Sequence, residues 1–234
     1  LAEGELESYC LDGFAHADRY RTWVGSGEGI GVVVFDVEGR VLGARPGPQD
    51  PAELAAYLRL VVQLRPSVAR ARAELVAAPT PQAQLRLGAL LLELGARRET
   101  ERLLKAAAEA GEPDAAQLLA RLCALEGRLD SARQWLARCP PSPGASVTLG
   151  YLLYKERRHA EAVASLARAL VGDLGPERPR ARLFFGKALH ESGRDAEAIP
   201  VLEALIADTA GTTFAGAAAH TLGHIRNPDH GHTH

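Results

Sequence analysis

The fold is decided by two similar stretches, LGYLLYKERRHAEAVASL at 149–166 and FGKALHESGRDAEAIPVL at 185–202. In both, the glycine in second place is followed 12 residues later by alanine and 16 residues later by leucine. A further leucine stands three residues after each glycine, so apolar residues recur at helical spacing. Each stretch therefore predicts two amphipathic helices that are joined by a short turn.

The same spacing occurs twice more toward the N-terminus, which makes four repeats in phase. Their small, small and large residues are Gly88–Thr100–Leu104, Ala120–Ala132–Leu136, Gly150–Ala162–Leu166 and Gly186–Ala198–Leu202, with starts 32, 30 and 36 residues apart. We expect the small residues where the two helices cross, because larger side chains there would push the helices apart. Gly95, Gly127 and Gly193 stand where each first helix should end, and Arg157 takes that place in the third repeat.

This pattern resembles the tetratricopeptide repeat, in which two antiparallel helices recur about every 34 residues. The resemblance covers about residues 80–213 and implies four repeats, near 81–112, 113–142, 143–178 and 179–213. Residues 214–226 are expected to form a capping helix over the last repeat, followed by a histidine-rich tail at 227–234. The predicted fold class is mainly α: a solenoid of helical hairpins preceded by a small α+β domain.

Residues 1–65 have a different pattern, which predicts five elements in the order β-α-β-β-α. They are a strand at 5–11, a helix at 13–23, strands at 31–36 and 40–44, and a helix at 50–64. The two later strands flank the turn Val37-Glu38-Gly39 and are typical of a β-hairpin. Asp50 as a cap and Pro51 at the first helical position favour a helix start there. Residues 66–80 are expected to be a linker or a helix.

That order, with YCLDGFAHADRYRTW, VVVFDVEGRVLG and DPAELAAYL, resembles the second half of a thioredoxin fold, so residues 1–65 are interpreted as a partial thioredoxin-like domain. The family's redox CxxC belongs upstream of this half, and the sequence contains none. Gly31 stands where the family has its cis-proline. Thioredoxin-type exchange is therefore not carried over, Cys10 is interpreted as a core cysteine, and we predict that the chain is not an enzyme.

Two further predictions concern the start of the chain. Because its edge is unpaired, we predict a homodimer through Glu5–Leu11. The chain also contains no methionine, so we interpret Leu1 as a cut end and expect the first half of the fold to be missing.

Composition excludes several classes of partner. With 27 basic and 29 acidic residues the formal net charge is −2, which lacks the basic excess that nucleic-acid binding needs. No apolar run approaches the roughly 18 residues of a membrane span, and no signal peptide is visible. Three cysteines without CxxC or zinc spacing favour a cytoplasmic, reducing compartment, with the periplasm left open if a leader was removed before Leu1.

The tetratricopeptide resemblance implies that a peptide or helix binds in a concave groove lined by the first helices. The groove residues that it implies, spread over the four repeats, are Gln82, Leu85, Ala89, Leu92, Glu93, Asp114, Gln117, Arg121, Ala124, Val147, Tyr151, Tyr154, Lys155, Leu183, Lys187, His190 and Glu191. The two tyrosines with Arg121, Lys155 and Lys187 predict an acidic or aromatic-bearing protein partner. The alternative is that these residues are the solvated polar face of a purely structural array.

Five histidines lie close to the C-terminus: His220, His224, His230, His232 and His234. His220 and His224 are four residues apart on a predicted helix, so both could chelate one zinc or nickel ion. Thr221 stands where a metalloprotease helix needs its glutamate, so that chemistry has no general base. The alternative is a frayed polar tail or histidines that only pack against the cap.

The preferred interpretation is a non-enzymatic adaptor that binds a protein or peptide through its helical repeats, without nucleic acid or a membrane span. One alternative is a chaperedoxin-like holdase or thiol-redox helper whose redox motif is lost or lies upstream. Another is a transition-metal-binding protein that uses the C-terminal histidines. No cofactor is predicted apart from zinc or nickel at those histidines.

Overall fold

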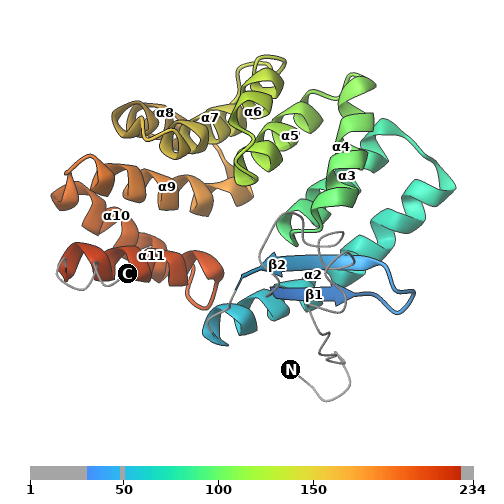
Figure 1. Ribbon diagram of the computed structural model, residues 1–234, viewed down its shortest axis with the longest axis horizontal. Helices are drawn as coiled ribbons and strands as arrows, with labels where there is room; N and C mark the ends of the chain where they lie inside the picture. Colours follow the sequence, from blue (N-terminus) through green and yellow to red (C-terminus); the bar gives the residue numbers. More distant parts are fainter. Residues whose placement is uncertain (1–30, 48–50, 228–234) are drawn as a thin grey trace. The chain divides into compact units, whose positions relative to one another are not determined.

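The computed structural model describes residues 31–47 and 51–227, in which the chain forms a two-stranded sheet and ten α-helices (Figure 1). The predicted mainly α fold class is confirmed, and a small two-stranded sheet precedes the helices. The chain divides into two compact units, Leu1–Leu122 and Cys123–His234, and we describe each by itself. Within the described residues, none of the helices has the length and apolar character that crossing a membrane requires.

The first unit begins with an antiparallel hairpin of β1 (Gly31–Phe35) and β2 (Val41–Pro46), with a bulge between Val34 and Phe35. The Asp36 carboxylate closes the turn, because it accepts hydrogen bonds from the backbone N–H groups of Glu38 (3.0 Å) and Arg40 (2.8 Å). These strands lie where the sequence predicted them. The strand at 5–11, the helix at 13–23 and the dimer edge fall outside the described residues, so the thioredoxin resemblance stays a prediction.

Helix α2 (Pro51–Ala77) is longer than the sequence predicted, since we expected it to end near Leu64. Pro66 lies inside it, and the apolar face continues on both sides of the proline through the buried residues Tyr57, Val61, Val68 and Ala71. Burial of this face offsets the hydrogen bond that proline cannot make. Residues 66–77 of the expected linker or helix are therefore helical.

The hairpin, α2, α3 (Pro81–Glu93) and α4 (Arg97–Glu109) share one hydrophobic core. Its focus is the carbonyl of Leu94 in the turn between α3 and α4, which accepts hydrogen bonds from the Tyr57 hydroxyl and the Ala44 N–H, both at 2.9 Å. A Cβ on Gly43 would lie 2.5 Å from that oxygen, so this strand position requires glycine. Arg72 adds a bidentate ion pair to Glu99 at 2.8 Å and donates to the Val41 carbonyl at 3.2 Å.

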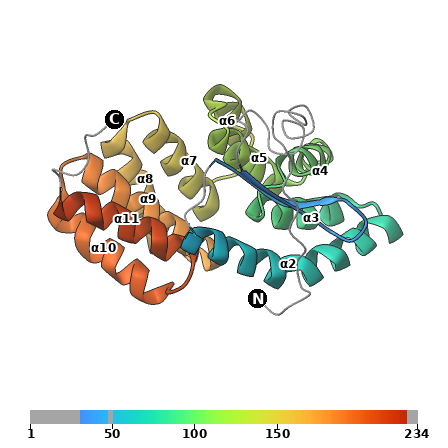
Figure 2. The ribbon, with the colours of Figure 1, turned by 60° about the horizontal axis from the view of Figure 1, so that its bottom comes forward.

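Helix α5 (Pro113–Leu125) contains the boundary between the units, and the second unit continues with six more helices. They are α6 (Leu129–Leu136), α7 (Pro143–Lys155), α8 (His159–Val171), α9 (Arg178–Glu191), α10 (Asp195–Asp208) and α11 (Thr213–Arg226), with a 3₁₀ turn at Gly175–Glu177 before α9. Consecutive helices from α7 to α11 pack against one another, and α11 also contacts α9 (Figure 2). Helix α11 covers Leu183, Leu202 and Leu205 with its buried Ala218 and Leu222.

The glycines of the repeats lie at the crossings of paired helices, as their spacing predicted. A Cβ on Gly88 would be 2.7 Å from Leu104, and one on Gly186 would be 2.6 Å from Leu202. A Cβ on Gly150 would clash with Leu166 in the same way. The middle residues Thr100, Ala132, Ala162 and Ala198 are all completely buried. Each glycine thus lets a fully buried leucine of the partner helix lie directly on the backbone.

The first helix of each repeat ends in one type of turn. Gly95, Gly127 and Gly193 have φ between 72° and 77°, and Arg157 adopts φ 62° at the matching place. The N–H of the next residue bonds a carbonyl five positions back, as from Ala96 to Leu91 (3.0 Å) and from Arg158 to Leu153 (2.9 Å). This is the Schellman motif, whose left-handed residue is normally glycine. Arg157 therefore pays a backbone penalty of about 1 kcal/mol.

Two glycine substitutions should have opposite effects on stability. Gly186→Ala places a methyl group against the buried Leu202, and we expect the free energy of unfolding to fall by about 2 kcal/mol. Gly216→Ala on the exposed side of α11 meets no atom within 4 Å, and we expect a gain of about 1 kcal/mol from helix propensity. Urea unfolding of the full chain measures both, and stabilisation by Gly186→Ala would contradict the crossing.

Arg157→Gly should stabilise the chain, because glycine adopts the left-handed conformation of this turn without steric cost. We expect the free energy of unfolding to rise by about 1 kcal/mol in urea. Arg157→Ala is the matched control, since alanine loses the guanidinium but keeps the backbone penalty. An equal gain from both variants would show that the arginine charge, and not the backbone, is responsible.

Candidate partner-binding face

The second unit brings together the predicted groove residues of the third and fourth repeats. Helices α7 and α9 are in contact, and residues three or four apart on each helix share a face. One polar and aromatic surface results, which we call the α7–α9 face and define as Tyr154, Lys155, Phe184, Lys187 and Glu191. Lys155 and Glu191 are exposed, and the other three are partly buried.

Phe184 is the centre of the α7–α9 face, although it was not among the predicted residues. Its ring lies 4.5 Å from the Tyr151 ring, edge to face, and 5.6 Å from the Tyr154 ring, centroid to centroid. Phe184 stands two residues before the repeat glycine, where the other repeats carry Arg86, Leu118 and Thr148. No periodic signal at this position could have pointed to it.

Tyr151 supports the α7–α9 face from beneath. It is only 5% exposed and packs in a cluster with Cys123, Ala124, Ala132 and Leu152. Its ring therefore contributes to the core and to the position of Phe184. A partner at the surface would meet Tyr154, which is half-buried, and not the Tyr151 ring.

Two lysines lie over the aromatic rings. The Lys155 ammonium is 5.7 Å from the centroid of Tyr151, and the Lys187 ammonium is 5.9 Å from that of Phe184. Within the described residues neither ammonium forms an ion pair. Burial lowers the pKa of Lys187, the nearby Lys155 charge lowers it further, and Glu191 opposes both. Burial, and secondarily Glu191, raises the pKa of Tyr154, so its hydroxyl remains protonated.

Other predicted residues of the second unit have structural partners. The His190 Nδ1 atom lies 2.7 Å from the Asp195 carboxylate at the start of α10, so the histidine ring is hydrogen-bonded across the turn between α9 and α10. Val147 and Leu183 are buried in hydrophobic clusters, and Ala124 is completely buried. These four residues position the helices, so in the second unit Tyr154, Lys155, Lys187 and Glu191 are the predicted residues that remain for the α7–α9 face.

In the first unit the most prominent predicted residue is Arg121. It is 4% exposed, and its guanidinium donates to the Glu93 carboxylate at 2.5 Å, so both charges are engaged with each other. Leu85 and Leu92 are buried, Ala89 and Gln117 are half-buried, and Gln82 and Asp114 are exposed. Arg121 therefore joins α5 to α3 in this unit and does not present its charge as the sequence analysis expected.

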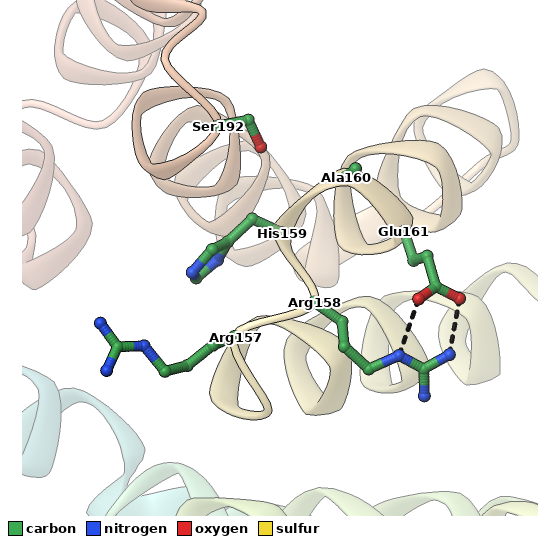
Figure 3. Close-up of a pocket in the computed structure, with 6 residues that line it drawn as sticks. All are labelled: Arg157, Arg158, His159, Ala160, Glu161 and Ser192. Carbon is green, nitrogen blue, oxygen red and sulfur yellow. Dashed lines mark hydrogen bonds and ion pairs between the residues drawn. The ribbon is translucent and has the colours of Figure 1, made fainter.

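A shallow pocket lies beside the turn between α7 and α8, lined by Arg157, Arg158, His159, Ala160, Glu161 and Ser192 (Figure 3). Arg158 is held by Glu161 through two hydrogen bonds of 2.7 and 2.6 Å. The Ser192 hydroxyl donates to the Ala188 carbonyl at 2.7 Å, and the His159 ring lies edge to face with Tyr154 at 5.5 Å. The serine and histidine are thus engaged separately and do not form a nucleophile–base pair.

The structure describes two of the five predicted metal-binding histidines. His220 and His224 are exposed on α11, with their Nε2 atoms 3.4 Å apart. His230, His232 and His234 fall outside the described residues. Among residues 31–47 and 51–227, no group of three or more histidine, cysteine, aspartate or glutamate side chains is placed to hold an ion.

Comparison with known proteins gives one family match. Residues 147–212, which include α7 to α10, match the model of the tetratricopeptide repeat family. No curated protein matches the chain. A solved structure titled "MamA MSR-1 C2" aligns with a TM-score of 0.39 and 18% identity, over 70% of this chain and 99% of that chain. The tetratricopeptide match thus covers the helices that form the α7–α9 face.

Proposed function

We propose that this protein is a non-enzymatic adaptor that holds an acidic, aromatic-bearing segment of a partner protein on the α7–α9 face. Tetratricopeptide repeats support a role as a protein-interaction scaffold in general. The observation that carries the finer proposal is the pair of lysines, Lys155 and Lys187, which lie over aromatic rings and form no ion pair within the described residues.

The charges of the face favour an anionic ligand. Burial and the neighbouring Lys155 charge both disfavour the charged form of Lys187 and lower its pKa, and Glu191 offsets this only in part. A carboxylate of a bound segment would supply the missing negative charge in a site that is already partly dehydrated. Charge-assisted hydrogen bonds are the stronger ones in such places.

The rings of the face favour an apolar or aromatic neighbour for that carboxylate. Phe184 and Tyr154 are partly buried, and the Phe184 ring lies against both the buried Tyr151 ring and the Tyr154 ring, so the platform is already ordered. A rigid aromatic platform costs little conformational entropy when a side chain docks on it. Glu191 at the edge would repel a carboxylate placed over it and so would restrict the register of the bound segment.

Replacing the two lysines should remove binding of acidic segments. We suggest selecting peptides from a random library on the immobilised full chain and measuring the affinity of the enriched peptides by fluorescence anisotropy. We expect acidic and aromatic sequences, and we expect Lys155→Ala with Lys187→Ala to weaken their binding by about tenfold or more, since each lost charge pair is worth about 1 kcal/mol. Affinity should also fall as salt is raised.

Lys105→Ala is the matched control, since Lys105 is the remaining one of the chain's three lysines and is exposed on α4. Glu191→Gln should tighten binding, because it removes a negative charge from the edge of the face. Unchanged affinity in the double lysine variant would refute the proposal. Tyr151→Ala is unsuitable as a test, because removing this buried ring is expected to cost about 3–5 kcal/mol of stability.

A further inference from the structure

A second feature of the chain lies on the exposed side of α11 and includes none of the residues that define the α7–α9 face. His220 and His224 are one helical turn apart, and their rings meet edge to face with centroids 4.5 Å apart. The closest approach is between the two Nε2 atoms, at 3.4 Å. Both side chains are exposed, so neither ring is held there by the core.

The separation of the two nitrogens matches a chelate. Zinc binds imidazole nitrogen at about 2.0–2.1 Å in tetrahedral geometry, so two nitrogens on one ion lie about 3.3–3.4 Å apart. The two Nε2 atoms already have this separation, at 3.4 Å. Divalent first-row ions that accept imidazole, such as Zn²⁺, Ni²⁺ and Cu²⁺, are the class of ligand that fits.

The surroundings of the pair leave it available. The only other charged side chain in the last turns of α11, Arg226, donates to the Glu203 carboxylate at 2.5 Å, which compensates its charge. No third histidine, cysteine or carboxylate completes the set within the described residues. An ion on the pair would therefore keep coordination positions for water or for a donor from elsewhere.

We infer that His220 and His224 together form a bidentate transition-metal site on α11, and that these two imidazoles alone are sufficient to bind one ion. The inference is independent of the adaptor role, because it uses no residue of the α7–α9 face. An ion that bridges His220 and His224 also links two successive turns near the end of α11. Since such an ion binds the folded helix, it stabilises the chain against unfolding.

The test is calorimetric titration of NiCl₂ or ZnCl₂ into the full chain carrying His230→Ala, His232→Ala and His234→Ala, which removes the tail histidines. We expect one ion per chain and a higher thermal unfolding midpoint with the ion. His220→Ala or His224→Ala in this background should weaken the affinity for the ion by about tenfold or more, since the chelate is lost.

A register control keeps the number of histidines constant. Ala219→His combined with His220→Ala leaves two histidines on exposed positions of α11 but separates them by five residues, so they no longer share a face. We expect this variant to bind as weakly as His220→Ala. Failure of the parent to bind, or equal affinity in the register control, would overturn the inference, and the unfolding midpoint without metal verifies that each variant folds.

Discussion

The structure depends on one steric constraint, the contact between a repeat glycine and the leucine 16 residues later on the partner helix. At Gly88, Gly150 and Gly186 there is no room for even a methyl group, and Leu104, Leu166 and Leu202 are completely buried against them. The contact sets how closely paired helices approach. The same type of turn then reverses the chain after each first helix, at Gly95, Gly127, Arg157 and Gly193.

The α7–α9 face follows from that geometry. With α7 and α9 in contact, Tyr151 fills the space beneath Phe184, and the two rings are held edge to face. The ammonium groups of Lys155 and Lys187 in turn lie over the rings of Tyr151 and Phe184. A binding face of this kind is ordered before any partner arrives, so the cost of docking is small. The adaptor proposal rests on this ordered and incompletely compensated charge.

Much of the fold could be predicted from the sequence, because small residues at helix crossings and glycines at helix ends leave a periodic signal. The hairpin and the capping helix left clear signals too. The length of α2 could not be predicted, since a proline at position 66 usually ends a helix, whereas here the buried Val68 and Ala71 continue its apolar face. The first strand and helix of the chain, and with them the thioredoxin resemblance, stay predictions.

The candidate site was only partly predictable, for physical reasons that differ between residues. Phe184 has no counterpart in the other repeats, so no period revealed it. Tyr151 and Arg121 stand at positions typical of a groove, but a large ring was drawn into the core and a guanidinium was engaged by Glu93. Which side chain at a boundary position turns inward depends on the space its neighbours leave, and a single sequence does not carry that information.

The most direct measurement is an NMR titration of the ¹³C,¹⁵N-labelled full chain with an acidic, aromatic-bearing peptide selected on it. Our account predicts that the largest shifts occur at the Tyr154 and Phe184 rings and at the side chains of Lys155 and Lys187, while Leu166 and Leu202 at the helix crossings stay unchanged. Shifts that leave these four residues unaffected and appear instead on α8, α10 or α11 would contradict the account.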